Sequence, residues 1–196
     1  MSGPRLVGIG VGPGDPELLT LAGLRELRTA ATVFVPVLDA SEQGRAEAVV
    51  RANLGDAGTV ERLVFALNDA VDGPQERRKR CWDAAAGVVA ERLRTGGTVA
   101  FATLGDPAVY STFGYLAESV LAVLPQVTVA TVPGVTAMQA AASAAGVSLV
   151  EGRDSLTLLP LTPSGAGTAA VAEAVRGHGA VAVYKAGGRT AELART

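Results

Sequence analysis

The stretch that decides the fold is Arg5–Thr20, which reads RLVGIGVGPGDPELLT. Its opening residues are aliphatic or glycine, a run typical of a buried strand, and they end in a cluster of glycine and proline. Asp15 then stands where a helix N-cap is expected, with Pro16 at the first helical position. The stretch therefore predicts a strand over Arg5–Val11, a tight turn, and a helix from about Pro16 to Arg28.

The same alternation of short apolar strands and longer helical stretches continues along the chain. Thr98–Leu104 is the clearest further strand, and Gly96 and Gly97 before it mark the end of a long helix. The other expected strands are Thr32–Val35, Thr59–Phe65 and Val127–Val132, and the expected helices are Ala46–Leu54, Pro74–Arg94 and Val109–Val123. Repeated β-α-β units predict an α/β fold with a mostly parallel, doubly wound sheet.

The C-terminal part repeats this theme more loosely. We expect a first α/β domain over residues 1–132 and a second over residues 133–196. In the second, the pattern predicts a helix over Thr136–Ala145, strands over Leu156–Leu159 and Ala180–Tyr184, and a loop over Ser164–Thr168. So few strands make an incomplete layer, and Thr190–Arg195 starts a helical pattern at the end of the sequence. We therefore expect the second domain to be incomplete in this chain.

The composition bounds the class of protein. Of 196 residues, 48% are hydrophobic but only 4% are aromatic, so the expected core is aliphatic. A net charge of −2 argues against a nucleic-acid partner, and no apolar run reaches membrane-spanning length. Cys81 and His178 are the only cysteine and histidine, which excludes an internal disulfide and leaves no set of zinc ligands. The composition favours a cytoplasmic protein without a metal.

Two of the expected strands end in similar turns, Gly12–Pro16 and Gly105–Pro107. Ligands of open α/β sheets bind beyond the carboxyl ends of the strands, so both turns should lie on the functional edge. The dinucleotide fingerprint G-x-G-x-x-G is broken, because Pro13 and Asp15 stand where a glycine is required. A pyrophosphate also needs free amides and a positive helix end. A ligand without phosphate that carries positive charge suits these turns better; the alternative is that both aspartates only cap helices.

Three segments, in order, resemble the signatures of the tetrapyrrole (corrin/porphyrin) methylase family. They are Val7–Leu21, Leu104–Pro107 and Val132–Ala137, each of which closes a predicted strand. The order and spacing are similar from about Leu6 to Lys185. The resemblance implies two α/β domains that hold S-adenosylmethionine in the cleft between them, with S-adenosylhomocysteine as the product.

The resemblance also implies which residues contact this cofactor. Pro13 matches the proline that borders the cofactor, and the second turn matches the segment that contacts its methionine and ribose portions. Lys185 stands where some relatives have methionine. The implied set is Pro13, Leu104, Gly105, Asp106, Val109, Thr136, Ala137, Tyr184 and Lys185.

The run Asp106–Leu116, DPAVYSTFGYL, is similar to that of precorrin-2 C20-methyltransferases within the family, and so is Val33–Val37. Val35-Pro36 stands where uroporphyrinogen-III methyltransferases usually carry Tyr-Asp, so a carboxylate proposed to act in that reaction is missing. The resemblance implies methylation of precorrin-2, with or without cobalt, at C20 in cobalamin synthesis. A sibling methylase that acts at another ring carbon, or a truncated cofactor-binding module without activity, are the alternatives.

Methyl transfer from a sulfonium has a good leaving group. We therefore expect the protein to act mainly by positioning the cofactor and the substrate, and we assign no catalytic residue. A polycarboxylate substrate needs basic groups at the mouth of its site, for which the candidates are Arg45, Arg51, Arg153 and Arg189. The expected substrate contacts are Pro36, Tyr110, Ser111, Thr112, Arg45 and Arg153. At least one of Tyr110 and Tyr115 is expected in the core. Members of the family are commonly homodimers, and the same is expected here.

Overall fold

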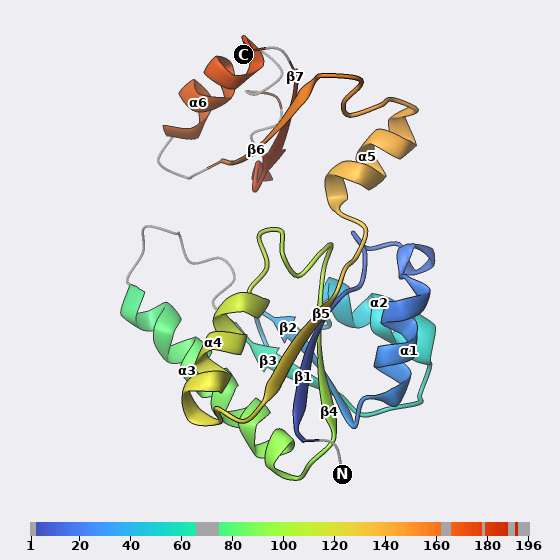
Figure 1. Cartoon of the computed structure of the whole chain (residues 1–196), viewed down its shortest axis with the longest axis vertical. Helices are drawn as coiled ribbons and strands as arrows, with labels where there is room; N and C mark the ends of the chain where they lie inside the picture. Colours follow the sequence, from blue (N-terminus) through green and yellow to red (C-terminus); the bar gives the residue numbers. More distant parts are fainter. Residues whose placement is uncertain (1–2, 66–74, 162–165, 178, 188–190, 192–196) are drawn as a thin grey trace. The chain divides into compact units, whose positions relative to one another are not determined.

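In the computed structural model, a five-stranded sheet with the strand order β3-β2-β4-β1-β5 forms the centre of the N-terminal part (Figure 1). Every pairing in this sheet is parallel. The strands are β1 (Arg5–Gly10), β2 (Thr32–Val37), β3 (Val60–Val64), β4 (Thr98–Thr103) and β5 (Thr128–Val132). The helices are the 3₁₀ helix η1 (Pro16–Leu18), α1 (Leu21–Thr29), α2 (Arg45–Leu54), α3 (Gln75–Arg94) and α4 (Phe113–Val123). The predicted parallel α/β sheet is confirmed.

The structure describes residues 3–65, 75–161, 166–177, 179–187 and 191. Contacts divide the chain into two compact units. The first comprises residues 1–69 and 74–137, and the second is formed chiefly by residues 138–196. The division falls after Ala137, and the domain bounds expected from the sequence, 1–132 and 133–196, stay a prediction.

The two faces of the five-stranded sheet are covered by different helices and have different cores. Helices α1 and α2 lie on one face and α3 and α4 on the other (Figure 1). The alternation of side chains along a strand sends Val7 and Ile9 to the first face and Leu6 to the second. The first core is wholly aliphatic. The second contains all four phenylalanines, Phe34, Phe65, Phe101 and Phe113, so the aliphatic expectation holds for one face only.

Two helices begin later than the sequence predicted. The expected helix from Pro16 is split, because Asp15 caps only the short η1 and Leu19 is extended. Thr20 is the N-cap of α1, and its Oγ1 accepts a hydrogen bond from the Gly23 N–H at 3.0 Å. The expected helix from Val109 begins at Phe113, because Tyr110 has a left-handed backbone.

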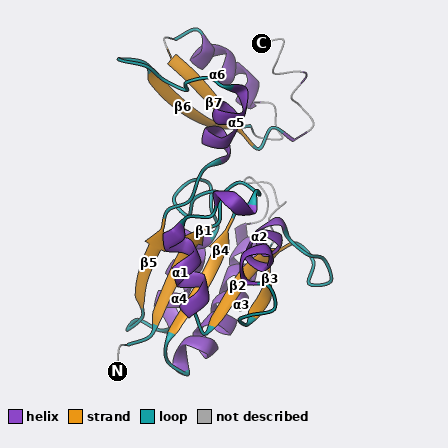
Figure 2. Ribbon diagram, turned by 90° about the vertical axis from the view of Figure 1, so that its right-hand side faces the viewer, coloured by secondary structure: helices purple, strands orange, loops and turns teal. Residues whose placement is uncertain are grey.

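The second unit contains a two-stranded parallel sheet, with β6 (Ser155–Pro160) beside β7 (Gly179–Tyr184) (Figure 2). Its helices are α5 (Ala137–Ala145) and α6 (Ala166–Val175), and α6 packs against both strands. The loop predicted over Ser164–Thr168 is therefore wrong in its described part. Apart from Ala191, the predicted helix Thr190–Arg195 lies outside the described residues.

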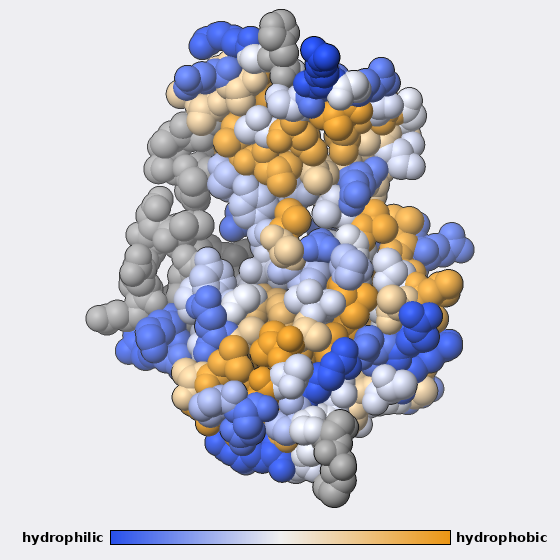
Figure 3. Space-filling view, in the orientation of Figure 1, coloured by the Kyte–Doolittle hydropathy of each residue, from blue (hydrophilic) through white to orange (hydrophobic). Residues whose placement is uncertain are grey.

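The described surface gives two further observations. In the first unit, apolar residues gather along the edge formed by β5 (Figure 3). No helix within the described ranges is both long enough and apolar enough to cross a bilayer.

Candidate functional site

The turns that follow β1 and β4 are joined at the carboxyl edge of the sheet. The Gly105 N–H donates to the Gly12 carbonyl at 2.7 Å, and the two residues form an isolated antiparallel bridge. The Val11 N–H donates to the Thr103 carbonyl at 2.9 Å, which continues the β1–β4 pairing into the turns. The two Gly-Asp-Pro turns therefore lie side by side.

The turn after β5 packs against both of them through glycine backbone. A Cβ atom on Gly10 would lie 2.5 Å from the Gly105 carbonyl oxygen and 2.6 Å from the Gly134 nitrogen. A Cβ atom on Gly134 would collide with the same carbonyl oxygen and with the backbone of Gly10. We call Gly10, Gly12, Gly105 and Gly134 the glycine junction. Its residues come from all three sequence signatures, and Gly10 and Gly134 are required because the backbones are in contact.

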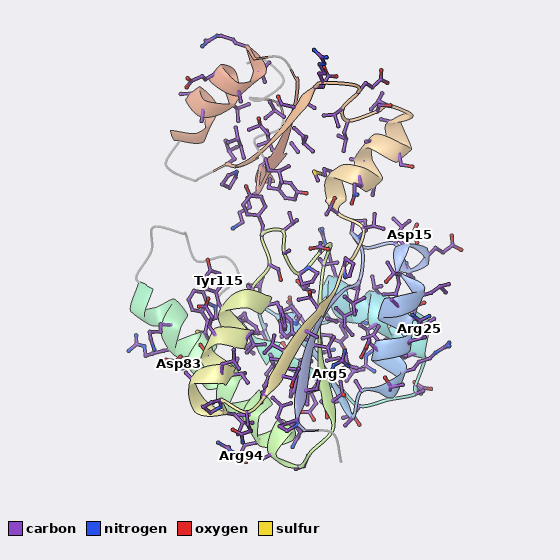
Figure 4. All side chains as sticks on the ribbon, in the orientation of Figure 1. Arg5, Asp15, Arg25, Asp83, Arg94 and Tyr115 are labelled. Atoms are coloured by element: carbon purple, nitrogen blue, oxygen red, sulfur yellow. The ribbon has the colours of Figure 1, made fainter. Side chains whose placement is uncertain are left out.

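Asp106 ties the second turn to the third. Its Oδ1 accepts a hydrogen bond from the Ala108 N–H at 2.7 Å, and its Oδ2 accepts one from the Gly134 N–H at 3.0 Å. No helix begins at this turn, since α4 starts at Phe113. The interpretation of Asp106 as a helix cap is therefore wrong. For Asp15, at the outer end of the first turn (Figure 4), it is right, because its Oδ1 accepts from the Glu17 N–H at 2.9 Å.

The turns around the glycine junction carry negative charge only. Residues 11–20, 104–112 and 133–136 contain Asp15, Glu17 and Asp106 but no lysine or arginine. A pyrophosphate would meet no cation here, whereas a sulfonium and an ammonium group would meet carboxylates and backbone carbonyls. These acceptor groups thus fit a cationic ligand without phosphate, as S-adenosylmethionine is.

A cavity of about 420 Å³ lies beside this junction, at the carboxyl ends of β2 and β4. The connection after β2 leads to α2 on one face of the sheet, and that after β4 leads to α4 on the other. Diverging connections of this kind leave a crevice between neighbouring strands. The lining residues are Pro36, Val37, Leu38, Glu42, Gln43, Gly44, Arg45, Ala46, Thr103, Leu104, Tyr110, Ser111 and Thr112.

All but one of the expected substrate contacts line this cavity. Pro36, Arg45 and the run Tyr110–Thr112 come together there from β2, α2 and the loop after β4. Arg153 does not, because it lies in the second unit between α5 and β6, where it is exposed. Arg189 falls among the residues that the structure does not describe, as does His178.

The loop after β4 is held by hydroxyl groups and contains a strained residue. Ser111 Oγ donates to Thr103 Oγ1 at 3.1 Å and accepts a hydrogen bond from the Phe113 N–H at 3.1 Å. Ser111 thus fixes the start of α4 as well as lining the cavity. Tyr110 has φ of 48°, which side-chain-bearing residues rarely adopt, and it is 44% exposed.

Neither tyrosine of the loop–α4 segment is in the core, contrary to expectation. Tyr115 is 47% exposed and stacks on Trp82 of α3, with ring centroids 4.4 Å apart and planes 2° apart. Asp83, one residue further along α3, accepts a hydrogen bond from Ser119 of α4 (Figure 4). These contacts join α3 to α4 and leave Tyr110 as the tyrosine at the cavity.

The remaining expected cofactor contacts are divided between the two units. Pro13 is half-buried in the first turn, and Val109 lies in the loop after β4, where its N–H donates to the Asp106 carbonyl. Thr136 is 7% exposed, and Ala137 begins α5. Tyr184 is the last residue of β7 in the second unit, and Lys185 follows it. The Tyr184 carbonyl accepts a hydrogen bond from the Leu161 N–H, and Lys185 has φ of 58°.

Sequence reasoning missed Glu47, which is fully buried in the first turn of α2. Its carboxylate accepts hydrogen bonds from Arg62 Nε at 2.6 Å and from Arg51 Nε at 2.8 Å. Burial alone would raise the pKa of Glu47, but these arginines outweigh burial and hold the pKa below its ordinary value. Arg51, a candidate for the substrate, is thereby engaged within the protein. The spacing of Glu47 and Arg51 gave the only available signal, and it is equally typical of a surface pair.

The chain is similar to known proteins in sequence and in fold. The family model for tetrapyrrole (corrin/porphyrin) methylases matches residues 5–196. The chain is 35% identical over 156 residues to a probable cobalt-precorrin-2 C(20)-methyltransferase of Methanocaldococcus jannaschii, covering 80% of this chain and 64% of that protein. It is also 35% identical over 162 residues to a precorrin-2 C(20)-methyltransferase of a Sinorhizobium species, covering 81% and 64%.

A solved structure of a cobalt precorrin-4 methyltransferase matches with a TM-score of 0.67 at 23% identity, over 97% of this chain and 72% of that one. At this identity the match shows the fold, which is that of the two-domain enzymes of the family. The chain spans less than two thirds of the length of the two curated relatives described above. From the match to its family model and its identity with these relatives, the chain belongs to the tetrapyrrole (corrin/porphyrin) methylase family.

Proposed function

We propose that this chain is an S-adenosylmethionine-dependent C-methyltransferase that methylates precorrin-2 or cobalt-precorrin-2 at C20 in cobalamin synthesis. The observation that carries the proposal is the cavity beside the glycine junction. It brings together Pro36 and Tyr110–Thr112, which belong to the two segments on which the resemblance to precorrin-2 C20-methyltransferases rests. The two 35%-identical relatives, whose names state that activity, support the same assignment.

The proposed cofactor contacts are those that the family resemblance implies. S-adenosylmethionine supplies the methyl group from its sulfonium, and the sulfur leaves as a neutral thioether. The proposed contacts in the first unit lie in the turns around the glycine junction. They are Pro13, Leu104–Asp106 and Val109, together with Thr136 and Ala137, which follow β5. These residues are proposed to bind and orient the cofactor. Asp106 contributes by accepting hydrogen bonds that hold the second and third turns together. The contacts of Tyr184 and Lys185, and a cofactor cleft between the two domains, stay predictions.

The proposed substrate contacts follow from the charge and polarity of the cavity. Among the described residues that line the cavity, Arg45 is the only lysine or arginine, and it suits a carboxylate arm of the tetrapyrrole. Tyr110 presents an exposed aromatic ring, and Ser111 and Thr112 add hydroxyl groups. No general base is proposed, because an electron-rich meso carbon attacks the methyl group directly. Arg153 remains a proposed contact from the second unit.

The proposal includes a cytoplasmic homodimer that binds neither nucleic acid nor membrane. The family resemblance supports the dimer. The net charge of −2 supports the absence of nucleic acid.

Isothermal titration with S-adenosylhomocysteine tests the cofactor site. The parent protein is expected to bind, and Asp106→Ala to bind at least about tenfold more weakly, because both turns lose a hydrogen-bond acceptor. Asp15→Ala is the matched control, since Asp15 caps only η1 and should change the affinity little. Absence of binding by the parent, or equal loss in both variants, would reject the cofactor assignment.

Incubation with precorrin-2 and labelled S-adenosylmethionine under anaerobic conditions tests the reaction. The expected product carries one added methyl group, located at C20 by carbon NMR. Label at a different ring carbon would identify a sibling methylase, and cofactor binding without any methylation of precorrin-2 would reject the proposed reaction.

A further inference from the structure

The buried carboxylate of Glu47 has no part in the proposed chemistry, yet both of its oxygens accept hydrogen bonds from arginines. Its two oxygens accept three hydrogen bonds from two arginines: Arg62 Nε at 2.6 Å, Arg62 Nη2 at 3.1 Å and Arg51 Nε at 2.8 Å. The pairing between Glu47 and Arg62 is bidentate, and it joins α2 to the edge strand β3. A buried ion pair is seldom more stabilising than apolar residues of the same volume. Stability alone therefore does not account for it.

Arg62 also holds the loop that forms one wall of the cavity. Its Nη1 donates to the Ala40 carbonyl at 2.9 Å, within residues 38–44 between β2 and α2. Leu38, Glu42, Gln43 and Gly44 of this loop line the cavity, and Arg45 follows directly. Glu47 stands just beyond the end of the same loop. One guanidinium thus contacts the loop near its start and the carboxylate that follows its end.

We propose that Glu47 and Arg62 are positioning residues that fix the 38–44 loop and present Arg45 at the substrate cavity. At the end of the loop, Gly44 caps α2 without a side-chain hydrogen bond. Inside the loop, Asp39 accepts hydrogen bonds from the N–H and the hydroxyl of Ser41, which orders its tip but does not anchor it to the sheet. The inference rests on the proposed function for the identity of the substrate.

The chain offers a matched control for this pair. Arg5 and Glu26 form a second bidentate strand-to-helix pair, with distances of 2.7 and 3.0 Å. It joins β1 to α1 at the amino end of β1, whereas the cavity lies at the carboxyl ends of β2 and β4. Glu26→Gln therefore removes the same kind of interaction away from the site.

Steady-state kinetics with precorrin-2, together with titration of S-adenosylhomocysteine, test the proposal on Glu47→Gln, Arg62→Lys and Glu26→Gln. Glu47→Gln and Arg62→Lys are expected to raise KM for precorrin-2 by about tenfold or more and to leave the cofactor Kd within about twofold. Glu26→Gln is expected to change neither quantity. Unchanged KM in folded Glu47→Gln, or an equal loss of cofactor affinity, would overturn the proposal.

Hydrogen exchange separates this inference from the proposed function. The amides of residues 38–44 are expected to exchange faster in Arg62→Lys than in the parent, with no change at the glycine junction. This result does not depend on any substrate. If the parent neither binds S-adenosylhomocysteine nor methylates precorrin-2, the proposed function fails; if exchange of the loop is unaltered in Arg62→Lys, the positioning role fails.

Discussion

Tyr110 has a left-handed backbone conformation, which is unfavourable for a residue with a side chain. A left-handed φ costs an L-residue roughly 1–2 kcal/mol, and glycine adopts it freely. A tyrosine that is strained, 44% exposed and at the wall of a cavity is better explained by function than by folding. We predict that Tyr110→Gly changes the free energy of unfolding by less than about 1 kcal/mol but lowers kcat/KM for precorrin-2 by about tenfold or more. Urea unfolding and steady-state kinetics measure the two quantities.

Tyr110→Phe is the control for this prediction, because it keeps the ring and removes only the hydroxyl. It should retain most of the activity if the ring contacts the substrate. Full activity in Tyr110→Gly would show that the ring has no role there, and a large loss of stability would show that Tyr110 serves the fold.

At the scale of single residues, the sequence pointed to part of the candidate cavity but not to the hydrogen bonds that hold its surroundings in place. Tyr110, Ser111 and Thr112 follow a recognisable turn and do line the cavity. The role of Asp106 in joining two turns could not be foreseen, since its partner at Gly134 is distant in sequence. Glu47 was missed for the same reason, because Arg62 reaches it only after β3 and α2 have packed.

Between elements, the glycine junction makes a steric prediction. Neither Gly10 nor Gly134 needs a left-handed φ, so alanine is excluded only by the contact between backbones. Gly134→Ala is predicted to destabilise the protein by roughly 2–4 kcal/mol, because carbonyl and backbone atoms cannot move aside cheaply. Gly87→Ala, on an exposed position of α3 with no neighbour within 4 Å, is predicted to stabilise it by about 0.5–1 kcal/mol. Thermal and urea unfolding of both variants compare them, and equal effects would contradict the steric argument.

Helix α2 carries a prediction about pH. Because the pKa of Glu47 is lowered in the folded protein, its charged form stabilises the fold fully above the ordinary glutamate pKa of about 4.3. That contribution is lost as the pH falls through the lowered folded value. Urea unfolding from pH 7 to pH 3 should show a steeper acid loss for the parent than for Glu47→Gln. Some acid sensitivity should remain in the variant, because the pKa of Glu26 is lowered by Arg5 as well. Identical slopes would show that folding does not lower the pKa of Glu47.

The sequence predicted the strands better than the starts of helices. Buried parallel strands read as short aliphatic runs, and Arg5–Gly10 and Thr98–Thr103 were found almost to the residue. Helix starts depend on single hydrogen bonds, such as that from Gly23 to Thr20, which compete with an equally good cap at Asp15. Helix α6 was not predicted at all, and its first residues were assigned to a loop because Ser164, Gly165 and Gly167 are residues typical of loops.

Over the whole molecule, the buried residues are distributed very unevenly. Both hydrophobic cores belong to the first unit. Among the described residues of the second unit, the buried apolar side chains are Ala142, Leu161 and Val171. We predict that amides of β1 and β4 exchange only through global unfolding, whereas those of β6 and β7 exchange at least about tenfold faster through local opening. Native-state hydrogen exchange measures both, and equal protection in the two sheets would contradict this division.

The last prediction concerns the proposed cofactor contacts. They run from Pro13 to Ala137 in the first unit and include Tyr184 and Lys185 in the second. A ligand that binds only the folded state stabilises every segment it holds, by about 2.7 kcal/mol at one hundred times its Kd. S-adenosylhomocysteine is therefore expected to slow exchange both in the turns after β1 and β4 and in the end of β7. Slower exchange in the turns alone would confine the cofactor site to the first unit and remove Tyr184 and Lys185 from it. Lys185→Ala distinguishes the cases by titration: a weakened affinity supports a contact from the second unit, and an unchanged affinity argues against that contact.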